Sequence, residues 1–71
     1  MIIDSKGDKM VLYGVRKNGK YLYQYQNRKA HWVYALDRAW MTHDKQMAIS
    51  FAGITKGTAI EITLTEKAIG L

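Results

Sequence analysis

The stretch MVLYGVRKNGKYLYQYQ, residues 10–26, consists of two runs of aromatic and β-branched residues that meet at Asn18-Gly19. These residue types suit the pleated, half-buried surface of a strand. Asn-Gly between two such runs is a strong signal for a tight turn. The stretch therefore predicts a β-hairpin over residues 10–26.

Two registers are open to this hairpin. With a two-residue loop, Val15 lies opposite Leu22, and each face mixes apolar and polar groups. With a three-residue loop over residues 17–19, in which Gly19 is left-handed, all the valines and tyrosines of the hairpin share one face. That face consists of Val11, Tyr13, Val15, Tyr21, Tyr23 and Tyr25. Because it separates apolar from polar groups better, we expect the three-residue loop, a type I turn with a glycine bulge.

The second half of the chain predicts one helix and one further strand. Thr42 can cap the amides of a following turn, Asp44 suits the positive end of a helix dipole, and Gly53 is a common helix terminator. We therefore expect an α-helix over residues 43–52. Residues 58–65 alternate between apolar and polar types, which predicts a half-buried strand.

The segment 31–40 allows two interpretations. Apolar residues recur in it at helical spacing, which favours one amphipathic helix. The triplet Trp32-Val33-Tyr34 is typical of a strand, however, and no capping residue precedes it. We favour short strands near 31–34 and 39–41, separated by a helical turn. Both interpretations place the two tryptophans inside.

Length and composition agree with a single small α+β domain over residues 1–71, in which one α-helix packs on a small antiparallel β-sheet. A chain of 71 residues is near the size at which one core barely offsets the chain entropy. Cysteine is absent, so neither disulfides nor thiolate metal sites stabilise the domain. No leader-like segment opens the sequence, and no apolar run approaches the roughly 18 residues of a membrane helix. We expect a cytoplasmic protein without membrane contacts.

Several packing and turn positions follow one another in a recognisable order. They are Gly19-Lys20-Tyr21-Leu22, then Trp32, Leu36 and Ala39, the pair Trp40-Met41, and a short helix with Ala48 and Phe51 before a closing strand. This order, over residues 10–65, resembles small proteins encoded by phages and prophages of Gram-positive bacteria, many of unknown function. The resemblance implies an accessory protein that acts on a host, defence or phage protein. It implies no catalytic or binding residue.

The reactive side chains form no known catalytic or metal-binding pattern. His31 and His43 have neither the i, i+4 spacing of a helical metal site nor any zinc-site spacing. Ser5 and Ser50 lie in no nucleophile motif, and the glycines form no phosphate-binding loop. We expect no enzymatic activity, no cofactor and no metal.

Basic and aromatic side chains are the candidate binding groups. The net charge is +5, and the basic residues form one cluster at the hairpin tip and another at its open end, roughly 20 Å away. The five tyrosines could form the wall beneath the helix, a protein-binding surface or a stacking platform for bases. The candidate binding residues are Arg16, Lys17, Lys20, Tyr23, Tyr25, Arg28, Lys29 and Tyr34.

The predicted function is binding without catalysis. A thin core leaves sheet faces and edges uncovered, and these favour docking on a protein partner or formation of a homo-oligomer. The alternative function is nucleic-acid binding, in which the basic side chains contact phosphates.

Overall fold

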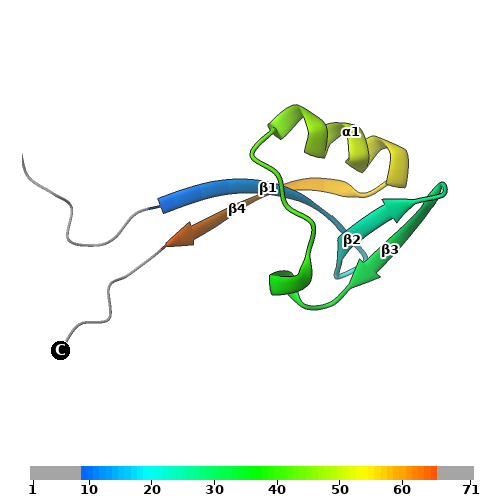
Figure 1. Ribbon diagram of the computed structural model, residues 1–71, viewed down its shortest axis with the longest axis horizontal. Coiled ribbons are helices and arrows are strands. Elements are labelled where there is room, and N and C mark those ends of the chain that lie inside the picture. The colour runs from blue at the N-terminus through cyan, green and yellow to red at the C-terminus, as the bar shows by residue number, and fades with distance from the viewer. Residues whose placement is uncertain (1–8, 66–71) are drawn as a thin grey trace, which may run out of the picture.

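The computed structural model describes residues 9–65, which form a four-stranded antiparallel sheet and one α-helix (Figure 1). The elements in chain order are β1 (Lys9–Lys17), β2 (Lys20–Gln26), β3 (Lys29–Val33), the 3-10 helix η1 (Leu36–Arg38), α1 (Lys45–Thr55) and β4 (Thr58–Thr65). The strands lie in the order β3-β2-β1-β4. The predicted α+β class is confirmed, and β4 has the bounds predicted for it. Within the described residues, no helix has the length and apolar character needed to cross a membrane.

The β1–β2 turn has two residues, so the predicted three-residue loop is wrong. Lys17 pairs with Lys20, and Asn18 and Gly19 between them have φ angles of 53° and 76°. Two left-handed residues make a type I′ turn, whose twist matches that of the flanking strands and needs no bulge. This register places both apolar and polar side chains on each face of the hairpin. It is nevertheless adopted because other elements cover parts of both faces of β1.

A β-bulge in β2 breaks up the face expected for the tyrosines. Trp32 of β3 pairs with Leu22, but His31 pairs with Gln24, so Tyr23 is an extra residue. The alternation of side chains changes at the bulge. Tyr23 is consequently exposed, whereas Tyr25 contacts Phe51 of α1 with 6.0 Å between ring centroids. The predicted face with all the tyrosines therefore does not exist.

Residues 40–42, which we call the wedge, lie where β1 and β2 separate. The Trp40 amide donates to the Leu22 carbonyl of β2 at 2.7 Å. Tyr13 of β1 and Thr42 exchange two backbone hydrogen bonds of 2.8 and 2.9 Å. The strand predicted near 39–41 is thus wrong, because the wedge forms an isolated bridge instead of a ladder. The helical turn expected before it is present as η1.

β3 begins two residues before the strand predicted near 31–34. Asn27 and Arg28 have φ angles of 54° and 61° and form a tight turn, after which Lys29 pairs with Gln26. Arginine is not a typical residue for a left-handed position, so turn chemistry did not reveal this hairpin.

α1 begins and ends later than the predicted helix 43–52. Asp44 is its N-cap, because one carboxylate oxygen accepts the amides of Gln46 and Met47 at 3.0 and 3.2 Å. Thr42, the predicted cap, accepts the Asp44 amide instead. Gly53 lies inside the helix, which ends at Thr55 and is followed by the left-handed C-cap Lys56, with a φ of 60°.

The core lies between α1 and the sheet. Val15, Leu22 and Ala52 are buried at its centre, and Trp32, Trp40 and Phe51 are among the side chains packed around them. The rings of Trp40 and Phe51 meet edge to face, 5.0 Å apart, so the wedge contributes to the core with its side chain as well as its backbone. Both tryptophans are partly buried against the core, as predicted.

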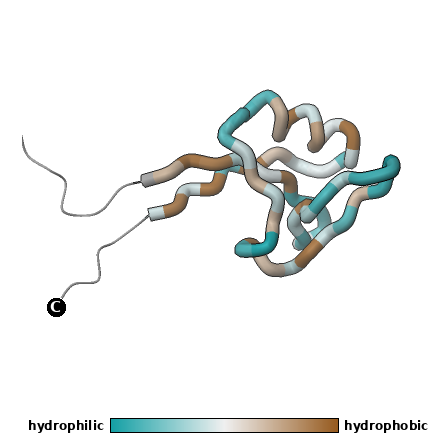
Figure 2. Tube along the Cα trace, in the orientation of Figure 1, coloured by the Kyte–Doolittle hydropathy of each residue, from teal (hydrophilic) through white to brown (hydrophobic). Residues whose placement is uncertain are grey.

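The β1–β4 ribbon extends beyond α1 (Figure 1). Lys9 pairs with Thr65 and Met10 with Leu64 at its far end. Apolar segments continue along both strands there (Figure 2), and Met10, Val11 and Leu64 are 50%, 40% and 41% exposed. The ribbon therefore presents apolar side chains that the described residues leave open to solvent.

We predict that Gly57→Ala destabilises the fold. A Cβ atom at Gly57 would lie 2.8 Å from Cγ1 of Val15 and 3.0 Å from the carbonyl oxygen of Arg16. Val15 is buried and the carbonyl belongs to β1, so neither can move freely. We expect the free energy of unfolding, measured by urea denaturation, to fall by about 1–3 kcal/mol.

The control for this prediction is Gly53→Ala. No atom lies within 4 Å of a Cβ built at Gly53, which occupies the interior of α1. Alanine there should raise the free energy of unfolding by about 0.5–1 kcal/mol. Equal stability of the Gly57→Ala variant and the wild-type protein would contradict the close contact between Gly57 and β1.

Candidate functional site

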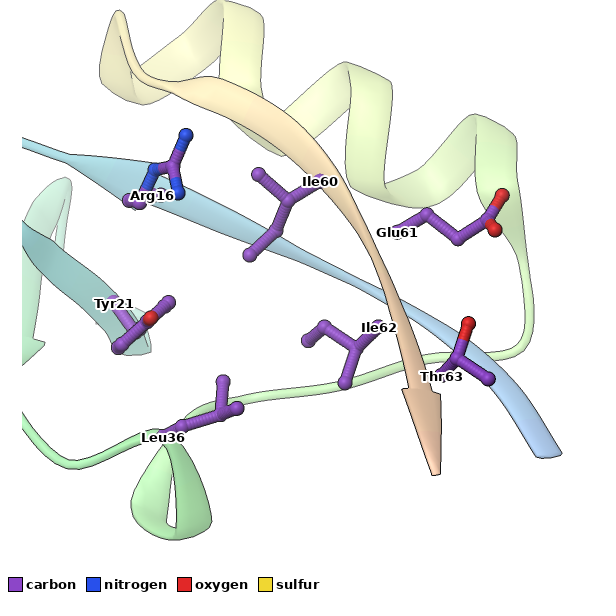
Figure 3. A pocket seen from close by; sticks show the side chains of 7 residues that line it. All are labelled: Arg16, Tyr21, Leu36, Ile60, Glu61, Ile62 and Thr63. Atoms are coloured by element: carbon purple, nitrogen blue, oxygen red, sulfur yellow. The ribbon is translucent and has the colours of Figure 1, made fainter. Parts of the chain in front are cut away.

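A shallow pocket of about 440 Å³, which we call the groove, lies against β1, β2, β4 and η1 (Figure 3). Leu36, Ile60 and Ile62 provide its apolar surface, and Arg16 and Tyr21 provide its polar groups. Glu61 and Thr63 also line it, but their side chains point away from the other five in Figure 3. The side chains that point toward the groove are therefore three apolar ones, one cation and one phenol.

Strand geometry explains how these residues come together. Alternation along β4 places Ile60 and Ile62 on one face of the sheet. Arg16 and Tyr21 are paired across the β1–β2 turn, so their side chains are neighbours. η1 brings Leu36 to the same side.

Gly14 of β1 lies against Ile62, one of the residues that line the groove. A Cβ atom there would lie 3.3 Å from Cδ1 of Ile62 and 3.2 Å from the Trp40 carbonyl oxygen. The absence of a side chain thus lets the wedge and Ile62 approach β1 closely. The wedge and Ile62 of the groove therefore both lie close to the backbone of β1 at Gly14.

Chemically, the groove can hold an apolar side chain and an anionic or hydrogen-bonding group beside it. Leu36 is 37% exposed, so apolar area is available for burial by a ligand. Arg16 is exposed and offers a planar guanidinium that can donate two hydrogen bonds to a carboxylate. Tyr21 adds a hydroxyl that can donate or accept.

Lys17, one of the predicted binding residues, has a structural position instead. It follows Arg16 in β1 and so points to the opposite face. Its ammonium group donates to the Thr55 carbonyl at 3.1 Å and lies 5.9 Å from the centroid of the Trp32 ring. A cation at the C-terminus of α1 is favoured by the helix dipole. Lys17 therefore ties the hairpin tip to α1.

The other predicted residues are divided among several places. Lys20 lies over the ring of Tyr34 at 5.1 Å, and Tyr34 is 75% exposed. Arg28 and Lys29 are exposed in the β2–β3 turn region, at the far end of β2 from Arg16. Tyr25 packs on α1, and Tyr23 is exposed at the bulge.

Of the predicted residues, the structure thus places Arg16 in the groove. Sequence reasoning missed Tyr21, Leu36, Ile60 and Ile62 as site residues. The alternation of β4 did place Ile60 and Ile62 on one face, but it did not show that this face stays partly open.

The titratable groups are dispersed. Among residues 9–65, no three His, Cys, Asp or Glu side chains come together in a way that could hold a metal ion. His31 in β3 and His43 before α1 are both exposed.

Comparisons with protein-family models, with curated proteins and with solved structures found no match to this chain. The resemblance to phage and prophage proteins therefore stays a prediction.

We predict that Lys17→Met lowers the stability of the protein. The substitution keeps much of the apolar stem but removes the charge that contacts the Thr55 carbonyl and the Trp32 ring. We expect the free energy of unfolding to fall by about 1 kcal/mol at low salt, and by less at high salt because ions screen this interaction. Lys20→Met changes the net charge by the same amount, but Lys20 lies over the exposed Tyr34 ring, so this substitution should lower the free energy of unfolding by less. Equal effects of the two substitutions would contradict the role given to Lys17.

Proposed function

We propose that this chain is a non-enzymatic binding protein whose groove holds a segment of a protein partner. The observation that carries the proposal is the combination of an apolar surface, formed by Leu36 and Ile60 over the buried Ile62, with the Arg16 guanidinium beside it. Apolar area contributes most of the binding free energy in such sites, and a few polar groups fix the orientation of the ligand.

The chemistry of the groove favours a partner segment with an apolar side chain next to an aspartate or glutamate. The apolar side chain would bury the exposed part of Leu36, and the carboxylate would accept hydrogen bonds from Arg16. The net charge of +5 supports the same choice, because a basic surface increases the rate at which acidic partners associate.

A protein partner would also suit an accessory protein of a phage or prophage, which is the role implied by the resemblance. We include that role in the proposal, with a host, defence or phage protein as the partner. The groove supplies the chemistry of recognition, and the genetic origin of the chain would supply the identity of the partner.

Selection of peptides from a random library tests the groove. We expect the selected sequences to share an apolar residue adjacent to Asp or Glu. A selected peptide should shift the amide NMR signals of Tyr21, Leu36 and Ile62. Arg16→Ala should weaken its binding roughly tenfold, because a charge-assisted contact at a partly exposed site is lost.

The matched control for Arg16→Ala is Arg28→Ala. Arg28 is also exposed, and its removal changes the net charge equally, but it lies in the β2–β3 turn away from the groove. Its substitution should leave peptide affinity nearly unchanged at physiological salt. Equal weakening by both substitutions, or selected peptides without acidic residues, would count against the proposal.

Nucleic-acid binding remains the second candidate, and one observation favours it. The exposed Tyr34 ring has Lys20 above it and lies close to the end of β1 that carries Arg16, so an aromatic face and cations come together there. The division of the basic residues between the two ends of β2 argues against a continuous phosphate-binding stripe.

An oligonucleotide mobility assay tests this alternative. Binding by counterion release predicts retardation at low salt and a steep loss of affinity as the salt concentration rises. Because Lys20 and Tyr34 lie close to Arg16 and far from Arg28, it also predicts that Arg16→Ala weakens retardation more than Arg28→Ala does. No retardation at low salt would exclude this candidate.

A further inference from the structure

β4 forms one edge of the sheet, and its outer side is open in the part of the chain that the structure describes. We propose that β4 pairs with β4 of a second copy of this chain in antiparallel orientation, which joins two sheets into one. This proposal uses the backbone edge of β4 and does not rest on ligand binding in the groove.

The sequence of β4 lacks the features that normally protect an edge strand. Natural edges are kept from pairing by lysines, prolines, bulges or short length. β4 has eight residues, TAIEITLT, with no proline, no glycine and no lysine, and it pairs with β1 in continuous register from Thr58 to Thr65. Glu61 is its single charged residue. The edge is therefore long, regular and nearly neutral.

The hydrogen bonds of the wedge determine which backbone groups of β4 point outward. Tyr13 directs its amide and carbonyl to Thr42, away from β4. Along a strand, the amide and carbonyl groups of successive residues point to opposite sides. The even-numbered residues of β1 therefore direct their amides and carbonyls to β4. Their partners there are Leu64, Ile62, Ile60 and Thr58. The amides and carbonyls that face outward consequently belong to Ala59, Glu61, Thr63 and Thr65.

One register of two β4 strands satisfies both these backbone groups and the side chains. If Ile62 faces Ile62 of the second copy, Glu61 faces Thr63 and Ala59 faces Thr65, each as a hydrogen-bonded pair. Ile60 then faces Leu64. Apolar side chains thus meet apolar ones, and each carboxylate meets a hydroxyl.

The neighbouring registers are worse. A shift that places Glu61 opposite Glu61 brings two carboxylates together, which is destabilising. Within the described strand, a shift that places Thr63 opposite Thr63 pairs only residues 61–65 with one another, fewer than the register centred on Ile62. The strand is therefore complementary to itself in one register, and this self-complementarity identifies a second copy as the partner.

The symmetry of the pair keeps the faces of the two sheets aligned. Antiparallel edge pairing requires a two-fold axis perpendicular to the sheet, so both α1 helices lie on the same side. On the other side, Leu64 packs beside Ile60 of the second copy, which covers part of a side chain that is 41% exposed in the single chain. One strand pair buries a small interface, so we expect a dimer that dissociates on dilution.

Sedimentation equilibrium of the full chain over a range of concentrations tests the proposal. The average mass should rise from 8.2 kDa towards twice that value as concentration increases. Thr63→Glu places like charges opposite one another at two positions of the dimer. It should raise the dissociation constant roughly tenfold.

The matched control is Thr63→Lys, which places an ammonium opposite each Glu61 and should leave the dimer as stable as the wild-type dimer or more stable. Thr63 is exposed, so both variants should keep the circular dichroism of the wild-type protein.

A second measurement uses Thr65→Cys, since the chain has no other cysteine. Spin labels at this position should lie about 20 Å apart in the dimer, six residues along paired strands.

Three results would overturn the proposal. The first is a constant mass of 8.2 kDa at every concentration. The second is equal weakening by Thr63→Glu and Thr63→Lys, and the third is a label separation far from the expected value. None of these results bears on peptide binding in the groove, which Arg16→Ala tests separately.

Discussion

The backbone hydrogen bonds of the wedge are the constraint on which the structure depends. β1 and β2 are paired at Lys17–Lys20 and Arg16–Tyr21 and then separate, which would leave buried amides and carbonyls without partners. Trp40 provides a hydrogen-bond partner for the backbone of β2, at Leu22. Thr42 does the same for the backbone of β1, at Tyr13. The segment that follows η1 thus connects the β2–β3 pair to the β1–β4 pair through backbone hydrogen bonds.

The wedge also explains how so short a chain obtains a core. Once β2 turns away from β1, Leu22 and Trp32 face Phe51 and Ala52 of α1 instead of continuing a flat sheet. The Trp40 ring enters the same core beside Phe51. A flat hairpin would expose this area, and a chain of 71 residues without cysteine has no disulfide to offset the loss.

The sequence predicted the elements better than their contacts. The hairpin and β4 were predictable because turn chemistry and alternation are local signals, whereas the end of α1 was not, because a lysine occupies the left-handed position where glycine is usual. The bulge at Tyr23 and the wedge depend on residues distant in sequence. For the same reason Arg16 was predicted as a binding residue, but the apolar residues beside it were not, since the position of α1 decides which sheet face stays open.

β4 can serve both proposed interactions because its side chains and its backbone point in different directions. Ile60 and Ile62 project from one face into the groove, while the amides and carbonyls of Glu61 and Thr63 lie in the plane of the sheet and point outward. α1 occupies the opposite face, where Ala48 is buried and Ala59 lines the space beneath the helix. Pairing at the edge therefore leaves Arg16 and Tyr21, on β1 and β2, accessible to a ligand. Because Leu64 of a second copy would lie beside Ile60, the paired strands would also lengthen the apolar surface of the groove.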